Sequence, residues 1–250
     1  MSVEPVIELN GVDVLHERGT EPLLRGVDWS IGEGEFWVVA GGPASGKTSL
    51  LATAAGMNRP GSGTLRIFGR ALVDATEEEQ VEWRRRIGFV FENGGRLLHH
   101  LTIADNLALP LQYHLKLNQQ ELWKRVDQML NRAELAAVAH STPSELSLQA
   151  QQRASLMRAL AVPTDILMLD SPLRILSPRE TRWWLEFIRE QRAQRGTDRK
   201  PLTVVVAGDD FRSWLEEATR FGVIENGRLR ILGSREEAKA AQEEAVRELV

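Results

Sequence analysis

One short run of the sequence has the residue types and spacing that phosphate binding requires. The pattern G-x-x-x-x-G-K-[ST] is fulfilled by Gly41-Gly42-Pro43-Ala44-Ser45-Gly46-Lys47-Thr48. In such a loop consecutive backbone N–H groups surround phosphate oxygens, the lysine meets the β- and γ-phosphates, and the hydroxyl binds Mg²⁺. The run therefore predicts a binding loop for the phosphates of a nucleotide, which extends to Ser49.

Two residues of this loop differ from those that would bind phosphate most easily. Pro43 has no N–H group to donate, and Ala44 lies where a glycine would adopt the loop conformation most easily. The N–H groups from Ala44 to Ser49 remain. We therefore expect phosphate binding to survive both departures.

The elements around the loop are typical of a nucleotide-binding α/β unit. Residues 35–40 are apolar at almost every position, which favours a strand buried on both faces, and a helical pattern runs from Lys47 to Gly56. Further strands are expected at 6–9, 27–31, 61–69, 87–91, 166–169, 202–207, 222–225 and 228–232. Helices are expected at 77–86, 147–161, 178–193 and the charged C-terminus, and residues 94–146 are predicted to be a helical insertion.

Composition narrows the class of protein. The 250 residues are 42% hydrophobic and 26% charged, with 31 Lys and Arg, 35 Asp and Glu, and no cysteine. A net charge of -4 argues against a protein that binds nucleic acid by neutralising phosphates, so we expect no nucleic-acid partner. No apolar run approaches the roughly 20 residues of a membrane span, and the first residues lack a secretion signal. These features favour a cytoplasmic protein.

Beyond the phosphate loop the sequence resembles the nucleotide-binding subunit of an ATP-binding cassette (ABC) transporter over nearly its whole length. The resemblance rests on five collinear segments, and these are 61–69 after the loop helix, 87–92 at the Q-loop, 146–153 at the L-S-G-G-Q signature, 163–170 at the Walker B strand, and 203–210 at the switch strand. Residues 97–114, with Thr102-Ile103-Ala104-Asp105-Asn106 and Pro110-Leu111, also resemble ATPases of Mla- or Mce-type lipid transport.

The resemblance implies an α/β fold of the P-loop NTPase type, a RecA-like core with an antiparallel β subdomain and an inserted α-helical subdomain. The implied parts are a core at 1–93 and 147–225, a helical subdomain at about 94–146, and a C-terminal strand and helix at 226–250. The implied ligands are ATP and Mg²⁺. The implied partners are transmembrane permease subunits and a second nucleotide-binding subunit, identical or different. The permease would dock on residues 92–115, where the apolar contact area is expected from Leu97, Leu98, Leu101 and Leu111. Such a protein would lie on the cytoplasmic face of the inner (cell) membrane.

Most motifs after the loop depart from the family pattern. Glu92 replaces the Q-loop glutamine, Ser171 the catalytic glutamate and Asp209 the switch histidine. The D-loop aspartate becomes Ser177. In the partner signature segment, Ser147 is kept, but Leu148, Gln149 and Ala150 replace two glycines and a glutamine. Asp170 is kept and can complete a metal site with Thr48, to which Glu92 can add an oxygen.

These substitutions predict impaired hydrolysis. A serine at 171 is too weak a base to deprotonate water near neutral pH, and Asp209 brings negative charge where a donor is needed. Leu148 and Gln149 would crowd a partner's phosphate. We expect an ATP-binding subunit that couples or scaffolds a permease; the alternative is an active ATPase in which Glu92, Asp209 or Asp210 is the base. A P-loop kinase fits the collinear segments poorly.

One further residue aligns with a ligand contact in the family. His16 lies where relatives place the aromatic ring that stacks on adenine. An imidazole can stack in the same way, but a histidine in a solvent-facing loop is an equal alternative. The seven tryptophans are expected to pack in the core or at interfaces.

Overall fold

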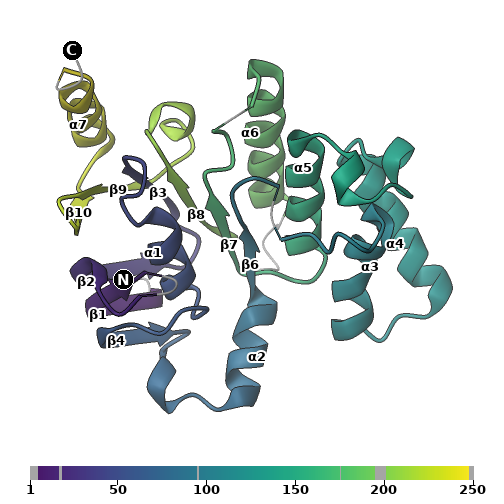
Figure 1. The fold of residues 1–250 in the computed structure, drawn as a ribbon, viewed down its shortest axis with the longest axis horizontal. Helices are drawn as coiled ribbons and strands as arrows, with labels where there is room; N and C mark the ends of the chain where they lie inside the picture. Colours follow the sequence, from purple (N-terminus) through teal and green to yellow (C-terminus); the bar gives the residue numbers. More distant parts are fainter. Residues whose placement is uncertain (1–4, 17–18, 95, 175, 195–200, 248–250) are drawn as a thin grey trace.

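The computed structural model of the chain describes residues 5–16, 19–94, 96–174, 176–194 and 201–247. Within these residues the strands form two sheets (Figure 1). The smaller sheet is antiparallel with the order β2-β1-β4-β5. Its strands are β1 (Pro5–Leu15), β2 (Pro22–Gly32), β4 (Ser62–Ile67) and β5 (Arg70–Ala71). This is the expected antiparallel β subdomain.

The larger sheet has the order β10-β9-β3-β8-β7-β6, and all of its strands except β10 are parallel to their neighbours. Its strands are β3 (Phe36–Gly41), β6 (Ile87–Val90), β7 (Ile166–Asp170), β8 (Thr203–Gly208), β9 (Arg220–Glu225) and β10 (Arg228–Leu232). Parallel strands end at the same edge of a sheet. The residues that follow β3, β6, β7 and β8 therefore come together there, where ligands bind in open α/β folds.

The core lies on both faces of the larger sheet, as the apolar runs predicted. Phe36, Val38 and Ala40 of β3 belong to one apolar cluster, whereas Trp37 and Val39 belong to another. Successive side chains of a strand point to opposite faces, so one strand contributes to two cores. The first cluster includes residues of α3 (Ile103–His114), α4 (Gln119–Arg132), α5 (Leu148–Ala159) and α6 (Pro178–Ala193). The second includes residues of α1 (Lys47–Ala54) and of the smaller sheet.

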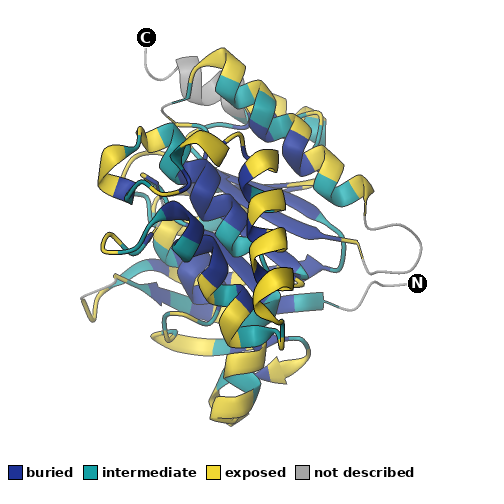
Figure 2. Cartoon of the chain, turned by 90° about the vertical axis from the view of Figure 1, so that its right-hand side faces the viewer, coloured by how far each residue is buried: buried dark blue, intermediate teal, exposed yellow. Residues whose placement is uncertain are grey.

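The helices are arranged around this sheet with their polar faces outward (Figures 1 and 2). They are α1 (Lys47–Ala54), α2 (Glu77–Arg86), α3 (Ile103–His114), α4 (Gln119–Arg132), α5 (Leu148–Ala159), α6 (Pro178–Ala193) and α7 (Arg235–Arg247). Capping boxes start α2, α3 and α4, in which Thr76, Thr102 and Asn118 each accept a bond from the third helical N–H. None of the helices in the described ranges is long and apolar enough to span a bilayer.

Several boundaries differ from those predicted. Helix 77–86 is confirmed, but the strands predicted at 6–9 and 27–31 are too short. The first continues to Leu15 because Gly11, with φ +59°, absorbs a register shift between Leu9 and Val12 rather than ending the strand. A glycine that forms a bulge is easily taken for a turn when only the sequence is considered.

Candidate nucleotide site

The phosphate loop connects β3 to α1 in the strand–loop–helix order that the sequence predicted. An added Cβ at Gly41 would lie 2.6 Å from Ser45 Oγ and 3.2 Å from Ile224 Cβ, so the Ser45 side chain would have to turn away. Ala44 has φ +59°, a conformation that glycine adopts more easily, and Gly46 has φ +100°. No described side chain caps the N-terminus of α1. Its first N–H groups are therefore available to an anion.

Lys47 is nearly buried at the start of α1, with only 8% of its surface exposed. Its ammonium group donates to the carbonyl oxygens of Gly41 at 2.6 Å and Gly42 at 2.9 Å. It also forms an ion pair with Asp209 at 3.2 Å. The loop thus surrounds its own lysine. Asp209, at the switch position, contacts the same lysine.

Thr48 and Asp170 form the arrangement expected of a magnesium site. The Thr48 hydroxyl donates to Asp170 Oδ2 at 2.7 Å, while Asp170 Oδ1 is buried with no hydrogen-bond partner among the described residues. Burial raises the pKa of the Asp170 carboxyl above its usual value and Glu92 raises it further, whereas Thr48 and Lys47 oppose the rise. A buried carboxylate oxygen without a partner fits a cation that also binds the Thr48 hydroxyl.

The described residues contain no cluster of three or more His, Cys, Asp or Glu side chains that could hold a metal by itself. Mg²⁺ does not need one, because it usually binds one or two protein carboxylates and completes its shell with water and phosphate oxygens. Thr48 and Asp170 would supply the protein's oxygens. The predicted third ligand, Glu92, is engaged elsewhere.

Glu92 and Asp209 are both held by Arg174, a residue that the sequence analysis missed. Arg174 Nη1 lies 2.5 Å from Glu92 Oε1, and its Nε lies 3.8 Å from Asp209 Oδ2. Glu92 also raises the pKa of Arg174. The signal available in the sequence was a lone basic residue four positions after Asp170, beside two unexplained acidic substitutions.

Ser171 immediately follows the Walker B strand and is buried. Its N–H donates to Ala207 O at 2.9 Å, and its backbone is left-handed, with φ +48°. The residue therefore lies at the carboxyl edge beside the loop. A serine hydroxyl is a poor base near neutral pH.

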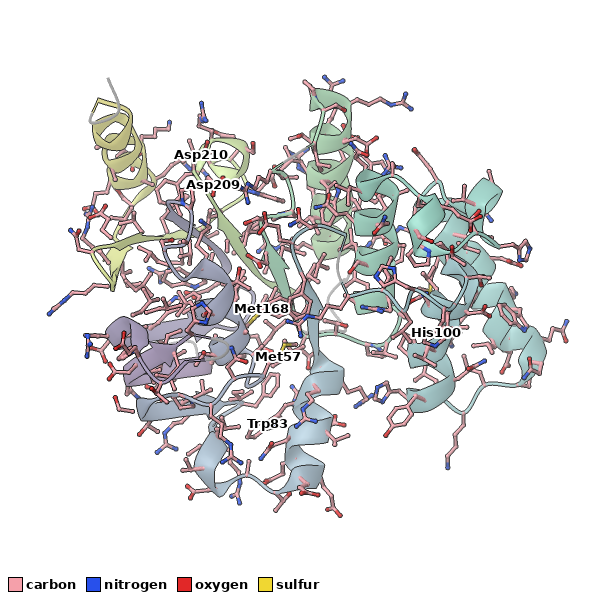
Figure 3. All side chains as sticks on the ribbon, viewed as in Figure 1. Met57, Trp83, His100, Met168, Asp209 and Asp210 are labelled. Carbon is pink, nitrogen blue, oxygen red and sulfur yellow. The ribbon has the colours of Figure 1, made fainter. Side chains whose placement is uncertain are left out.

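These residues line one pocket of about 320 Å³. It contains the loop from Pro43 to Ser49, together with His16, Leu23, Glu92, Ser171, Arg174 and Asp209. His16 is exposed at this pocket, where an aromatic base could reach it. Asp210 does not line it, because that carboxylate forms an ion pair with Arg212 beside a neighbouring pocket. Figure 3 shows Asp209 and Asp210 side by side beyond the end of β8.

The partner signature segment lies at the start of α5 and outside this pocket. Ser147 accepts a hydrogen bond from the N–H of Ala150 at 3.3 Å, which confirms that it caps the helix. Leu148 is 43% exposed. In one copy of the chain the segment therefore faces solvent, and only a second subunit could bring an equivalent segment to the loop.

A second hollow, of about 510 Å³, lies between α3 and the edge of the larger sheet. Leu98, Leu109, Tyr113 and Phe89 contribute its apolar surface, and Arg84, Arg85 and Arg158 its basic surface. Two residues predicted as contact area, Leu97 and Leu111, are instead buried in the core, where they pack with α3 and α4. Leu98 and Leu101 are half-buried, whereas Leu109 and Tyr113 are exposed.

A model of a known protein family matches more than half of the chain. The family model described as ABC transporter matches residues 24–174. The sulfate/thiosulfate import ATP-binding protein CysA of Caulobacter vibrioides is 34% identical, over 91% of this chain and 65% of that protein. The methionine import ATP-binding protein MetN of Rhizobium etli is 31% identical, over 91% of this chain and 61% of that protein. The chain thus spans less than two thirds of these relatives' length.

Solved structures agree with the sequence comparison. Dimeric MJ0796, a bacterial ABC transporter cassette, matches with a TM-score of 0.80 and 28% identity, over 91% of this chain and 99% of that one. Clostridium perfringens cbiO1, part of the transporter complex cbiONQ, shares the fold at 22% identity, with a TM-score of 0.75 over 98% of this chain and 94% of that one. From the matched family model, the loop geometry and the fold, the chain belongs to the ABC transporter family.

Proposed function

We propose that the chain is an ATP-binding subunit that binds Mg-ATP and holds or couples a membrane permease, with impaired hydrolysis. The observation that supports Mg-ATP binding is the Thr48–Asp170 pair beside the phosphate loop. One buried oxygen of Asp170 has no hydrogen-bond partner among the described residues. Lys47 would meet the β- and γ-phosphates, and His16 would stack on the base. Mg²⁺ would neutralise phosphate charge between Thr48 and Asp170.

The impaired half of the proposal rests on the residues around the terminal phosphate. Hydrolysis requires a group that orients and deprotonates water, and donors for the charge that develops on the phosphate oxygens. Ser171 supplies no base, and Asp209 adds negative charge beside Lys47. The alternative is an active ATPase with Glu92 or Asp209 as its base. The pairing of both carboxylates with Arg174 favours impairment, because each carboxylate is already engaged by a guanidinium group rather than by an attacking water.

Calorimetry and phosphate release test both halves. Mg-ATP should bind to the chain, and Lys47→Ala should weaken binding by at least about tenfold, the scale of one charged hydrogen bond. Lys124→Ala, which removes an exposed lysine on α4, should change nothing. Equal affinity of Lys47→Ala and the parent contradicts the binding proposal. Turnover near the roughly 10 s⁻¹ median of enzymes supports the active alternative, and Glu92→Gln should then abolish it.

The proposed partners are transmembrane permease subunits and a second nucleotide-binding subunit, the same or different, on the cytoplasmic face of the membrane. The matched relatives are named for sulfate/thiosulfate and methionine import, which favours an importer, while residues 97–114 resemble lipid-transport ATPases. The named relatives and the resemblance of residues 97–114 indicate different transported substrates. We therefore propose a permease as the partner and name no transported substrate.

The hollow beside α3 is the proposed docking surface. Exposed Leu109 and Tyr113 beside Arg84 and Arg158 suit a permease segment with apolar and acidic residues. The double substitution Leu109→Asp with Tyr113→Asp should reduce the fraction of chain retained on membranes that contain the permease. Val73→Asp, at an apolar residue with 83% exposure outside the hollow, is the matched control. Equal retention of all three proteins rules out this surface.

A further inference from the structure

In and beside the nucleotide pocket, acidic side chains outnumber basic ones. Glu92, Asp170 and Asp209 lie in or beside it, against the cations Lys47 and Arg174. A nucleoside triphosphate brings further negative charge, of which Mg²⁺ offsets only part. Like charges within a few ångströms repel each other, most strongly where water is excluded. Arg174 therefore decides whether the wall opposite the loop repels phosphate or accepts it.

The geometry places Arg174 at the terminal-phosphate end of the pocket. Asp209 lies between two cations, with Oδ1 at 3.2 Å from Lys47 and Oδ2 at 3.8 Å from Arg174. Because a lysine at this loop position meets the β- and γ-phosphates, its neighbours across Asp209 lie close to the outermost phosphate. The candidate for base stacking, His16, also lines the pocket.

The guanidinium group also has capacity for another acceptor. Nη1 donates to Glu92 and Nε faces Asp209, whereas Nη2 makes no hydrogen bond within the part of the chain that the structure describes. The Arg174 side chain is 50% exposed, so a ligand can reach it. An arginine presents its donors as a planar fork that suits phosphate oxygens.

We propose that Arg174 is a nucleotide-binding residue, which neutralises Glu92 and Asp209 and donates to the terminal phosphate, so that the site prefers a nucleoside triphosphate to a diphosphate. The inference rests on the proposed nucleotide-binding function and adds its specificity. In the empty protein the two carboxylates hold the guanidinium in place. In the complex the phosphate replaces part of that pairing, and Lys47 moves from Asp209 to phosphate oxygens.

The test measures Mg-ATP and Mg-ADP affinities of the chain and of Arg174→Gln by calorimetry. Arg174→Gln should weaken ATP binding about tenfold, the scale of one charged hydrogen bond, and ADP binding by less than about threefold. Arg212→Gln is the matched control, because Arg212 is also an exposed arginine paired with an aspartate, but in the neighbouring pocket. Its ATP and ADP affinities should equal those of the parent.

A charge-rescue variant separates this role from a structural one. In Glu92→Gln with Asp209→Asn the wall carries no carboxylates, so adding Arg174→Gln should cost ATP binding less than it does in the parent. Arg174→Lys, which keeps the charge without the fork, should lie between the parent and Arg174→Gln. A melting temperature for Arg174→Gln close to that of the parent shows that the fold is intact.

Two results overturn the inference. One is unchanged ATP affinity in Arg174→Gln, and the other is an equal loss for ATP and ADP. If either occurs while Lys47→Ala still loses binding, the proposed function stands and only the role of Arg174 fails. If the parent chain itself binds neither nucleotide, the proposed function fails instead.

Discussion

The two walls of the nucleotide pocket differ in how their polar groups are satisfied before any ligand binds. On the loop wall, Asp170 Oδ1 and Ser45 Oγ are buried without hydrogen-bond partners among the described residues. On the opposite wall, Arg174 is paired with both Glu92 and Asp209. The loop wall thus keeps unpaired oxygens for a ligand or a cation, while the carboxylates of the opposite wall are already paired, with Arg174 and, for Asp209, also with Lys47 of the loop. Binding depends on both walls, whereas turnover depends mainly on the wall opposite the loop, so turnover can be changed while the loop wall is left intact.

The largest expected effect comes from restoring the general base and the switch histidine on the wall opposite the loop. Ser171→Glu with Asp209→His should raise phosphate release by about 10²–10⁴-fold, the usual contribution of a general base, where a second subunit completes the site. The histidine also removes the negative charge beside Lys47. A steady-state phosphate-release assay measures the change.

The matched control is Ser171→Gln with Asp209→His, which has the same shape without a base and should stay slow. Equal rates for the glutamate and glutamine variants would show that general-base loss is not what limits the parent. Unchanged rates in both would point to the signature segment, where Leu148 and Gln149 replace glycines, as the remaining obstacle.

A smaller effect is expected on the loop wall from Asp170→Asn. Because burial raises the pKa of Asp170, its contribution to the free energy of unfolding is favourable at low pH and is lost as pH rises through the raised pKa. The neutral amide avoids that loss. The metal-free variant should therefore melt a few degrees above the parent at neutral pH, and this difference should shrink as the solution is acidified.

The same variant should lose the Mg²⁺-dependent part of ATP binding, because an amide is a weaker ligand than a carboxylate. Asp74→Asn, at an exposed aspartate of the β subdomain, serves as the control for both readouts. A variant that melts below the parent at neutral pH contradicts the sign worked out from burial. Unchanged Mg²⁺ dependence contradicts the metal site.

The smallest effect is expected from Ala44→Gly. Glycine relieves the left-handed strain at φ +59° but loses more entropy on folding, and the two terms nearly cancel. The stability should change by less than about 1 kcal/mol, and ATP affinity should change by less than about twofold. Thermal melts and calorimetry measure both. A large gain in affinity would mean that the loop wall is not already shaped for phosphate.

The loop wall was predictable from the sequence, whereas on the opposite wall Glu92 and Asp209 were identified but their partner Arg174 was not. A phosphate loop is contiguous, and its flanking strand is an apolar run, so the pattern at 36–48 is sufficient. Arg174 instead meets a carboxylate 82 positions away, a contact created by the order β3-β8-β7-β6. Leu97 and Leu111 were misassigned for a related reason, since which apolar side chains of the helical segment face inward depends on how α3 packs.

The contacts of Lys47 also affect how this residue can be modified chemically. Its three ammonium hydrogens have three acceptors, the carbonyl oxygens of Gly41 and Gly42 and the Asp209 carboxylate. An ammonium group that is buried and surrounded by acceptors is shielded from an electrophile in solution. Amine-reactive labels should therefore modify exposed Lys116 and Lys124 of the empty protein and spare Lys47. Among the lysines that the structure describes, the lysine of the phosphate loop is the one that the fold protects from acylation.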